Sequence, residues 1–157
     1  MMNKFELSEQ QKLLVEKVGV FHEKAGMQPA QARILSLLLI SDKVELSFEE
    51  IQEALGFSRS AISNALNALL NLNKIEYVTF PGNRKRFFRS RLMNWKEDMK
   101  EAFQGLSIMN ELFKEILVQR TSDTKEFNQS LENIIDFLDH MQTEVRGMID
   151  RWEAARK

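Results

Sequence analysis

The sequence contains no cysteine and only two histidines, and both shortages exclude classes of function. Without cysteine the chain has no disulfide, no thiolate metal site and no cysteine nucleophile. The histidines, His22 and His140, lie far apart, and no HExxH or comparable ligand spacing is present. The sequence also has no nucleophile–base pattern and no phosphate-binding loop. We therefore expect neither an enzyme nor a bound metal or cofactor.

Long apolar segments are missing as well. No run approaches the roughly 18 apolar residues that a membrane span needs, and the first ten residues lack the apolar core of a signal peptide. With 43 % hydrophobic and 29 % charged residues, the chain should fold and stay soluble. Its 157 residues suffice for one compact domain or two small units that share a core. We expect a cytoplasmic protein that does not associate with membranes.

The net charge of −1 conceals a strong segregation of charge. Between Gly56 and Trp95 there are seven basic residues and a single acid, Glu76, which amounts to a charge of +6 and leaves −7 for the rest. One positive segment in a near-neutral chain indicates a localised surface that binds a polyanion.

The stretch from Ser47 to Arg91 has the pattern of a helix, a tight turn, a second helix and a basic β-hairpin. Ser47 and Glu50 have capping-box spacing, and Gly56 permits the positive φ of a tight turn. Ser58 is a candidate N-cap for the second helix. This order of elements is typical of a winged helix-turn-helix, whose natural partner is double-stranded DNA.

The second helix of this motif carries two different faces. An apolar face should point to the core and consists of Ile62, Ala65, Leu66, Leu69 and Leu70. A polar face follows helical spacing on the other side and consists of Ser60, Ser63, Asn64, Asn67 and Asn71. An ordinary solvated face would favour Glu and Lys, which are better helix formers than Ser and Asn. Short hydroxyl and amide groups can reach base edges and phosphates, and Arg59 adds a cation near the helix start, so we predict a DNA-reading face.

The hairpin that follows is predicted to run from Lys74 to Phe80 and back from Lys85 to Ser90, around a turn at Pro81-Gly82-Asn83. Its tip presents Asn83, Arg84, Lys85 and Arg86. A clustered basic tip suits contact with phosphates or a narrow minor groove. The candidate DNA-binding residues are Ser58, Arg59, Ser60, Ser63, Asn64, Asn67, Asn83, Arg84, Lys85 and Arg86.

Helices are predicted before this motif. A capping-box pattern at Ser8 predicts a helix over about residues 8–25. Its apolar residues at helical spacing are Leu13, Leu14, Val18 and Phe21. Pro29 suits the first turn of the next helix, which is so rich in Ile and Leu that we expect it to be the buried centre of the DNA-binding unit.

After Arg91, apolar residues recur at alternating spacings of four and three. The first series is Trp95, Met99, Ala102, Leu106, Met109, Phe113 and Ile116, and the second is Phe127, Leu131, Ile134, Leu138, Met141, Val145, Met148 and Trp152. A short polar turn at residues 121–124 separates them, which predicts an antiparallel two-helix hairpin. Further apolar residues widen both faces, so this surface needs a partner, and the simplest is a second copy of the chain.

These elements predict a mainly α fold with a small β-hairpin. Residues 1–27 would form an N-terminal helix that contributes to dimerisation. Residues 28–92 would form the winged helix-turn-helix DNA-binding domain, and residues 93–157 an antiparallel dimerisation hairpin.

Three segments carry a resemblance to the MarR-like winged-helix transcriptional regulators, and within them to the GbsR-type branch. They are FHEKAGMQPAQARILSLLLIS, LSFEEIQEALGFSRSAISNALNALLNLNKIEYV and PGNRKRFFRSRLMNW. The resemblance spans about Phe21 to Trp95 and implies a homodimer on a pseudo-palindromic operator, often with a small-molecule effector. Many MarR-like wings carry an Asp near the tip that braces an Arg, whereas this chain has Asn83 near that place.

The sequence therefore favours a sequence-specific transcriptional regulator that binds double-stranded DNA as a homodimer. Tyr77, Trp95 and Phe103 are candidates for an aromatic pocket that holds a cationic effector, with ordinary core packing as the alternative. The rival function is a winged-helix protein-interaction module with a coiled-coil-like assembly hairpin. The operator, the regulated genes, the effector and the direction of regulation do not follow from the sequence.

Overall fold

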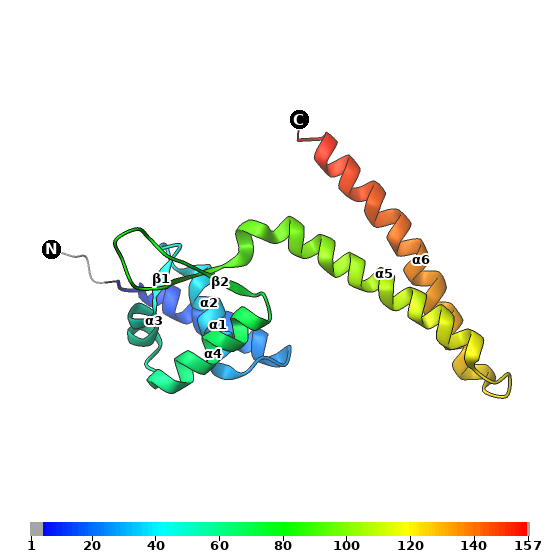
Figure 1. The fold of residues 1–157 in the computed structure, drawn as a ribbon, viewed down its shortest axis with the longest axis horizontal. Coiled ribbons are helices and arrows are strands. Elements are labelled where there is room, and N and C mark those ends of the chain that lie inside the picture. The colour runs from blue at the N-terminus through cyan, green and yellow to red at the C-terminus, as the bar shows by residue number, and fades with distance from the viewer. Residues whose placement is uncertain (1–4, 157) are drawn as a thin grey trace. The chain divides into compact units, whose positions relative to one another are not determined.

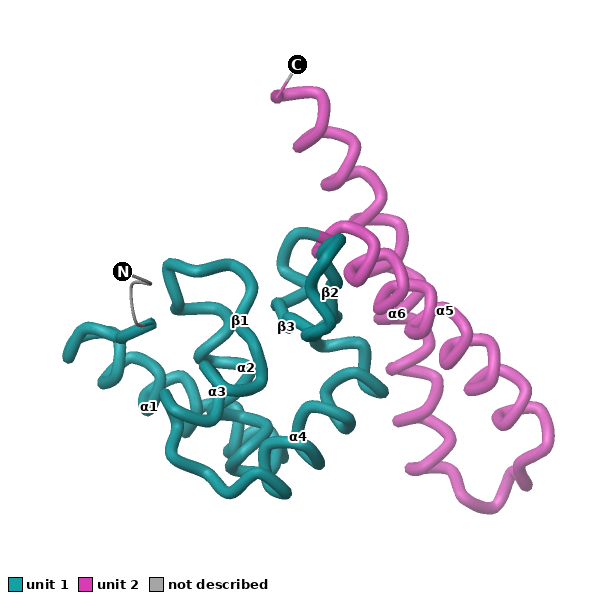
Figure 2. The backbone as a smooth tube through the Cα atoms, turned by 60° about the vertical axis from the view of Figure 1, so that its left-hand side comes forward, with its two compact units in different colours: residues 1–93 teal, residues 94–157 magenta. Residues whose placement is uncertain are grey.

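The computed structural model describes residues 5–156, which form a mainly helical fold with a small antiparallel sheet (Figure 1). The elements are α1 (Glu9–Lys24), α2 (Pro29–Ile40), β1 (Leu46–Ser47), α3 (Phe48–Leu55), α4 (Arg59–Asn71), β2 (Ile75–Val78), β3 (Phe87–Ser90), the 3-10 helix η1 (Arg91–Asn94), α5 (Trp95–Gln119) and α6 (Lys125–Ala154). The chain divides into two compact units, residues 1–93 and 94–157 (Figure 2). The predicted fold class is confirmed.

Helix starts in the first unit follow the predicted caps. Ser8 and Gln11 form a reciprocal capping box at α1, and Ser47 and Glu50 form another at α3. Ser58 caps α4 by accepting a hydrogen bond from the backbone N–H of Ala61 at 3.2 Å. Each cap satisfies a backbone donor that the helix itself leaves unpaired. The positions where these three helices begin are therefore determined by residues within one turn of each start.

The sheet has three strands in the order β1-β3-β2, one more than a simple hairpin. The third strand, β1, consists of Leu46 and Ser47 directly before α3. Leu46 is opposite Phe88 across the antiparallel pairing, and both side chains are buried. The other two strands are shorter than predicted, because pairing between β2 and β3 extends only from Ile75 to Val78 and from Phe87 to Ser90.

The core of the first unit forms around α2, as its composition predicted. Ile34 and Leu37 are fully buried, and the helix packs against α1, α3, α4 and β3. Ser36 is also buried, and its hydroxyl donates a hydrogen bond of 2.7 Å to the carbonyl of Ala32. A buried hydroxyl with a partner costs little stability, so this helix can sit at the centre of the unit.

The most hydrophobic residues of α1 are not the ones that pack on the rest of the first unit. Val15 and Gly19 are buried, whereas Leu13 and Phe21 are exposed by 71 % and 68 %, and Leu14 is also exposed. The apolar residues at helical spacing therefore stay exposed, apart from the partly buried Val18. The cause lies in α2, which approaches α1 at its smallest residue rather than at its largest ones.

Gly19 makes room for an ion-pair network between the two helices. The side chain of Arg33 on α2 is 14 % exposed, and its guanidinium donates to the carboxylates of Glu16 and Glu23 on α1. A Cβ at position 19 would lie 2.4 Å from Nη1 of Arg33. The two carboxylates hold the guanidinium in place, so the close approach depends on glycine.

The second unit is the predicted antiparallel hairpin of α5 and α6. The face of α5 that packs on α6 includes Phe103, Asn110 and Leu117, whereas much of the predicted seam, such as Leu106 and Met109, is exposed. The assignment of that heptad series to the intramolecular seam is therefore wrong for α5. On α6 the prediction holds in part, with Leu131 and Leu138 buried and with Phe127, Ile134 and Met148 exposed.

A polar residue occupies the middle of this seam. Asn110 is fully buried, and its Nδ2 donates to Oδ1 of Asp139 at 2.7 Å. Its own Oδ1 is buried and accepts no hydrogen bond from residues 5–156. Lys114 also donates to Asp139, at 3.0 Å. A buried amide with a single partner specifies helix alignment at a cost in stability.

Replacement of Gly19 tests the contact between α1 and α2. We expect Gly19→Ala to lower the free energy of unfolding by about 1–2 kcal/mol, because the new methyl group displaces the guanidinium of Arg33 from its carboxylates. In an Arg33→Ala background the same change should raise stability by about 0.5–1 kcal/mol through helix propensity. Urea unfolding of the four proteins measures both effects. The same sign in the two backgrounds would contradict the assigned contact.

Candidate nucleic-acid interface

The apolar face of α4 is buried in the core, and the opposite, polar face therefore points to the solvent. Ile62 and Leu69 are fully buried, and Ala65 and Leu66 nearly so. The residues of the opposite face that are exposed are Ser60, Asn64, Asn67 and Asn71, and Ser63 is half-buried. The structure thus places the predicted polar residues together on one accessible face of a well-anchored helix. Its start is also polar, since the hydroxyls of Ser58 and Ser60 lie 3.2 Å apart.

The wing is the segment from Thr79 to Arg86 between β2 and β3, and a tight turn shapes its tip. The backbone N–H of Asn83 donates to the carbonyl of Phe80 at 3.0 Å, and Gly82 has a φ of 77°. Pro81 before this glycine completes the signature of a type II turn. The side-chain Oδ1 of Asn83 then accepts from the backbone N–H of Lys85 at 3.0 Å. Asn83, Arg84, Lys85 and Arg86 are all exposed, as predicted.

The cations of this surface differ in the contacts that they make with other residues of the protein. The ammonium of Lys85 lies 3.3 Å from the carboxylate of Glu49 on α3. The guanidinium of Arg86 lies over the ring of Tyr77 at 4.9 Å, and that of Arg59 over the ring of Phe48 at 4.8 Å. Arg84 makes no hydrogen bond, ion pair or ring contact with any residue of the described range. It is the wing cation most available to an outside anion.

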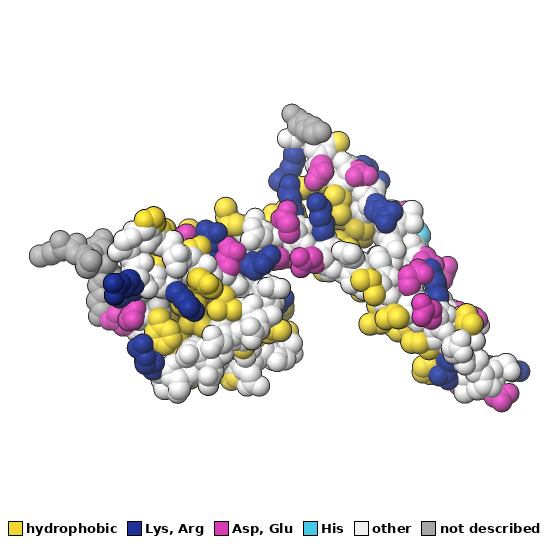
Figure 3. Space-filling model, viewed as in Figure 1, with side chains coloured by type: hydrophobic (Ala, Val, Ile, Leu, Met, Phe, Trp, Pro, Cys, Tyr) yellow, Lys and Arg dark blue, Asp and Glu magenta, His cyan; other side chains and the backbone are white. Residues whose placement is uncertain are grey.

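Arg89 is committed to the sheet. Its guanidinium donates to Glu76 at 2.7 Å and lies 3.5 Å from Glu45. The hydrogen bond to Glu76 and the two nearby negative charges raise the pKa of Arg89 above its ordinary value. The charge of +6 counted along the sequence therefore overstates what a polyanion would meet. Figure 3 shows acidic and basic side chains interspersed on the face of the first unit that is in view.

A groove of about 250 Å³ joins the polar helix face to the wing. Its lining residues are Phe48, Glu49, Arg59, Ser63, Leu66, Asn67, Lys85, Arg86 and Phe88. Half of the predicted DNA-binding residues thus meet in one concave surface. Ser58, Ser60, Asn64, Asn83 and Arg84 do not line this groove, and of these Ser60 borders a neighbouring hollow with Arg59 and Ser63.

Glu49 is the residue of this surface that the sequence did not single out. Glu49 is next to Glu50, and the capping role of Glu50 was sufficient to account for two adjacent acids at a helix start. Lys85, the partner of Glu49, is 36 residues away in the sequence. No local pattern links positions so far apart. Both carboxyl groups have a pKa below the ordinary value. For Glu49 the causes are a hydrogen bond from its own backbone N–H and the charges of Lys85 and Arg59. For Glu50, burial raises the pKa, but hydrogen bonds from Lys43 and Ser47 outweigh it.

The three candidate effector residues are divided between the units. Tyr77 is in the first unit, half-exposed, with Arg86 over its ring. Trp95 and Phe103 are in the second unit, where they line an apolar groove of about 260 Å³ together with Met99, Met148 and Trp152. Trp152 was not among the residues predicted for such a pocket.

Two cations of the same unit already lie over the ring of Trp152, which lines this groove. Trp95 packs edge-on against Trp152, with ring centroids 5.6 Å apart. Lys96 and Arg156 lie over the Trp152 ring at 5.4 and 4.4 Å. These cations make the ring a poor site for the cationic ligand expected from the sequence.

Other kinds of site are not found in the part of the chain that the structure describes. Between residues 5 and 156, His, Asp and Glu side chains nowhere gather in a group of three that could hold a metal ion. No helix in the same range is long and apolar enough to cross a membrane.

The buried helices, the exposed polar face of α4 and the basic wing define a winged helix-turn-helix protein. Its residues 25–86 match the model of the MarR family. The chain is 25 % identical over 138 residues to the HTH-type transcriptional regulator MmpR5 of Mycobacterium tuberculosis, with 88 % of this chain and 84 % of the relative covered. The fold is also similar to the crystal structure of a transcriptional regulator with a TM-score of 0.72 and 23 % identity, covering 92 % of this chain and 99 % of that one.

Proposed function

We propose that the protein is a sequence-specific transcriptional regulator that binds double-stranded DNA as a homodimer on a pseudo-palindromic operator. The observation that carries this proposal is the groove in which an exposed Ser and Asn face meets a basic wing. The similarity to MmpR5, a transcriptional regulator, supports the same class of function. A protein that reads chromosomal DNA acts where the DNA is, so a cytoplasmic location is part of the proposal.

The two parts of the interface would contribute differently. The start of α4 would enter the major groove, where Ser60, Ser63, Asn64 and Asn67 hydrogen-bond to base edges directly or through water. The wing would follow the flanking backbone or minor groove with Arg84 at its tip. Because the polar face of α4 carries no cation after Arg59, specificity would come from the helix and much of the affinity from the wing.

Dimerisation rests on the apolar surface that the hairpin leaves uncovered within its own unit. Exposed apolar side chains continue along both helices and include Met109, Leu112 and Ile116 on α5 and Phe127, Ile134 and Phe137 on α6. Exposed apolar stripes of this extent mark interaction surfaces. A second hairpin related by a two-fold axis would cover them and would set two recognition helices about 34–36 Å apart, one turn of DNA.

A narrower proposal concerns control by a small molecule. The apolar groove of Trp95, Phe103 and Trp152 has the composition of a ligand pocket. The aromatic pocket expected from the sequence would favour a cationic effector, but Lys96 and Arg156 at Trp152 argue against that charge. Both tryptophans of the chain line this groove, so their fluorescence would report on its occupation.

Titration with duplex DNA at two salt concentrations tests the function itself. Phosphate contacts release counterions, so the affinity of a DNA-binding protein falls steeply as salt rises. The rival function, a protein-interaction module, predicts no salt-sensitive binding to duplex DNA. That result would replace the regulator with the rival.

Asn64 tests the assignment of the reading helix. Asn64→Ala should remove about 1–3 kcal/mol of discrimination at one base position of each half-site, because an amide that pairs with a base edge is lost. Binding to a selected operator and its single-base variants measures this loss. Asn71→Ala, at the far end of the same face, is the matched control and should leave discrimination unchanged. Equal discrimination by the Asn64 variant and the parent would refute the assignment.

Arg84 tests the role of the wing. Arg84→Ala should weaken binding to all duplexes by a similar factor and reduce the slope of log affinity against log salt by about 1 for each half-site. Lys17→Ala removes an equally exposed cation from α1 and should change neither quantity. A loss of preference for one base position, with the slope intact, would instead place Arg84 among the base-reading residues.

Phe137 tests the proposed dimer surface. Phe137→Glu should raise the dimer dissociation constant at least about tenfold, because a carboxylate would have to be buried in an apolar interface. Sedimentation analysis over a range of concentrations measures the change. Thr143→Glu adds the same charge at an exposed polar position of α6 and should leave the dimer intact. A parent protein that stays monomeric at micromolar concentrations would exclude the homodimer.

A further inference from the structure

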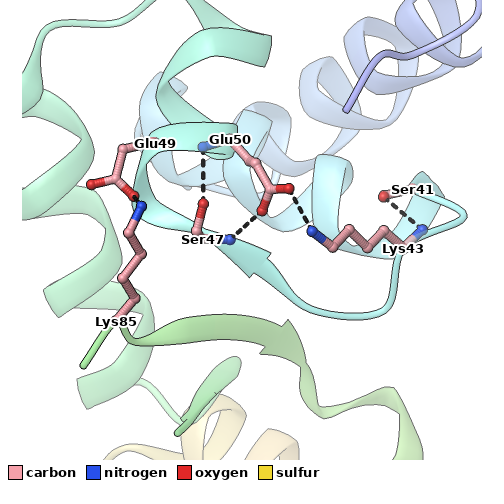
Figure 4. A network of polar contacts seen from close by, with 6 residues as sticks. All are labelled: Ser41, Lys43, Ser47, Glu49, Glu50 and Lys85. Atoms are coloured by element: carbon pink, nitrogen blue, oxygen red, sulfur yellow. Dashed lines mark hydrogen bonds and ion pairs between the residues drawn. The ribbon is translucent and has the colours of Figure 1, made fainter. Parts of the chain in front are cut away.

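The first turn of α3 connects two neighbouring parts of the DNA-binding unit (Figure 4). Glu50 accepts a hydrogen bond of 2.7 Å from the backbone N–H of Ser47, and its carboxylate also pairs with Lys43 in the loop before β1. Glu49, the preceding residue, points the other way and meets Lys85 of the wing. Adjacent carboxylates thus hold the loop on one side and the wing on the other.

We propose that Glu49 is a positioning residue of the DNA interface: through Lys85 it holds the wing tip against α3 and beside the recognition helix. The proposal rests on the DNA-binding function argued above. In it Lys85 serves as an anchor within the protein, whereas Arg84, one residue earlier, faces the DNA backbone. The sequence had assigned both cations to DNA.

The wing needs such an anchor because strand pairing ends before it. β2 ends at Val78 and β3 begins at Phe87, so residues 79–86 lie outside the ladder. Ordering the backbone of each of these residues costs conformational entropy. Apart from the turn itself, the side-chain contacts of residues 79–86 are Lys85 at Glu49, Arg86 over Tyr77, and Phe80 edge-on against Phe87 of β3 at 5.2 Å. The ion pair is the one that links the wing to α3. A wing without these contacts would have to be ordered when DNA binds. The conformational entropy lost at that step would lower the affinity for DNA.

Asn83 sets the direction of this contact. Its side-chain Oδ1 accepts a hydrogen bond from the backbone N–H of Lys85. This hydrogen bond bends the chain just after the type II turn. Many MarR-like wings carry an Asp near this place that braces an Arg, whereas this chain has the amide of Asn83 near it. Because an amide carries no charge, the tip cannot hold a cation by itself, and the negative partner comes from α3.

The charge of Glu49 makes the proposal sharply testable. Its lowered pKa keeps the group ionised near neutral pH, and a carboxylate close to phosphates repels them. If repulsion were its only effect, Glu49→Gln would tighten DNA binding. Anchoring predicts the opposite sign, and it predicts that the effect requires Lys85.

The experiment compares the parent, Glu49→Gln, Lys85→Gln and the double variant. The DNA probe is the tightest 30-base-pair duplex, roughly the span of two half-sites one turn apart, selected from a random library with the parent. Amide hydrogen exchange of residues 82–86 is measured in the free proteins. We expect Glu49→Gln to weaken binding about two- to tenfold, to speed exchange in the wing, and to add nothing further when Lys85 is already Gln.

The exposed pair of Glu9 and Lys12 on α1 supplies the matched control. Its ion pair is of the same kind, at 2.7 Å, and Glu9→Gln with Lys12→Gln should alter neither the affinity nor exchange in the wing. Unchanged wing exchange in Glu49→Gln, or equal or tighter DNA binding, would overturn the proposal. If the parent bound no duplex, the proposed function and the DNA role of Glu49 would fail together, while exchange in the free protein would still decide whether Glu49 holds the wing.

Discussion

Burial of α2 is the constraint on which the DNA-binding unit depends. Ile34 and Leu37 are fully enclosed, and the helix contacts α1, α3, α4 and β3. Because α4 packs on this helix through Ile62 and Leu69, its rotation about its own axis is determined by the core. A helix that could rotate would present different side chains at different times. The polar face therefore owes its fixed direction to apolar contacts on the opposite side.

Ion pairs then divide the basic residues of the motif into two groups. Arg89 is held by Glu76 and Glu45, and Lys85 by Glu49, whereas Arg84 remains exposed without such a partner within residues 5–156. Exposed pairs of this kind contribute little stability, about 0–1 kcal/mol each. Their greater effect is on orientation, since a paired cation points toward its own protein. A count of charges along a sequence cannot separate these groups, because the acids come from other elements.

Local signals predicted much of the fold. The serine caps at Ser8, Ser47 and Ser58, the glycine at the end of α3 and the two faces of α4 all depend on residues within one turn or one helix. The MarR-like and winged-helix assignments followed from these elements in order. The polar residues of α4 and the wing tip also lie where the sequence put them, although their contact with DNA stays a prediction.

The errors concern surfaces that form between elements. On α1, the helix packs through Val15 and Gly19 beside Arg33 of α2, a contact that the spacing of its apolar residues did not indicate. On α5 two overlapping stripes were available, and the more apolar one is exposed while Asn110 is in the seam. Periodicity shows that a stripe exists, but it does not say which partner covers it. The pairing of Glu49 with Lys85 was missed for the same reason, since it joins two elements.

The buried amide of Asn110 gives the hairpin the properties of a ruler. Sliding α5 along α6 by one heptad would carry Asn110 away from Asp139 and leave the buried side-chain NH2 of Asn110 without a partner, at a cost of roughly 1–3 kcal/mol. Apolar seams alone tolerate such shifts, because one methyl-lined position resembles the next. The single buried polar residue Asn110 favours one alignment of α5 along α6 over the others. Helices of 25 and 30 residues, aligned in one way only, keep one length from end to end, and any spacing set by the hairpin is then a property of the molecule rather than an average.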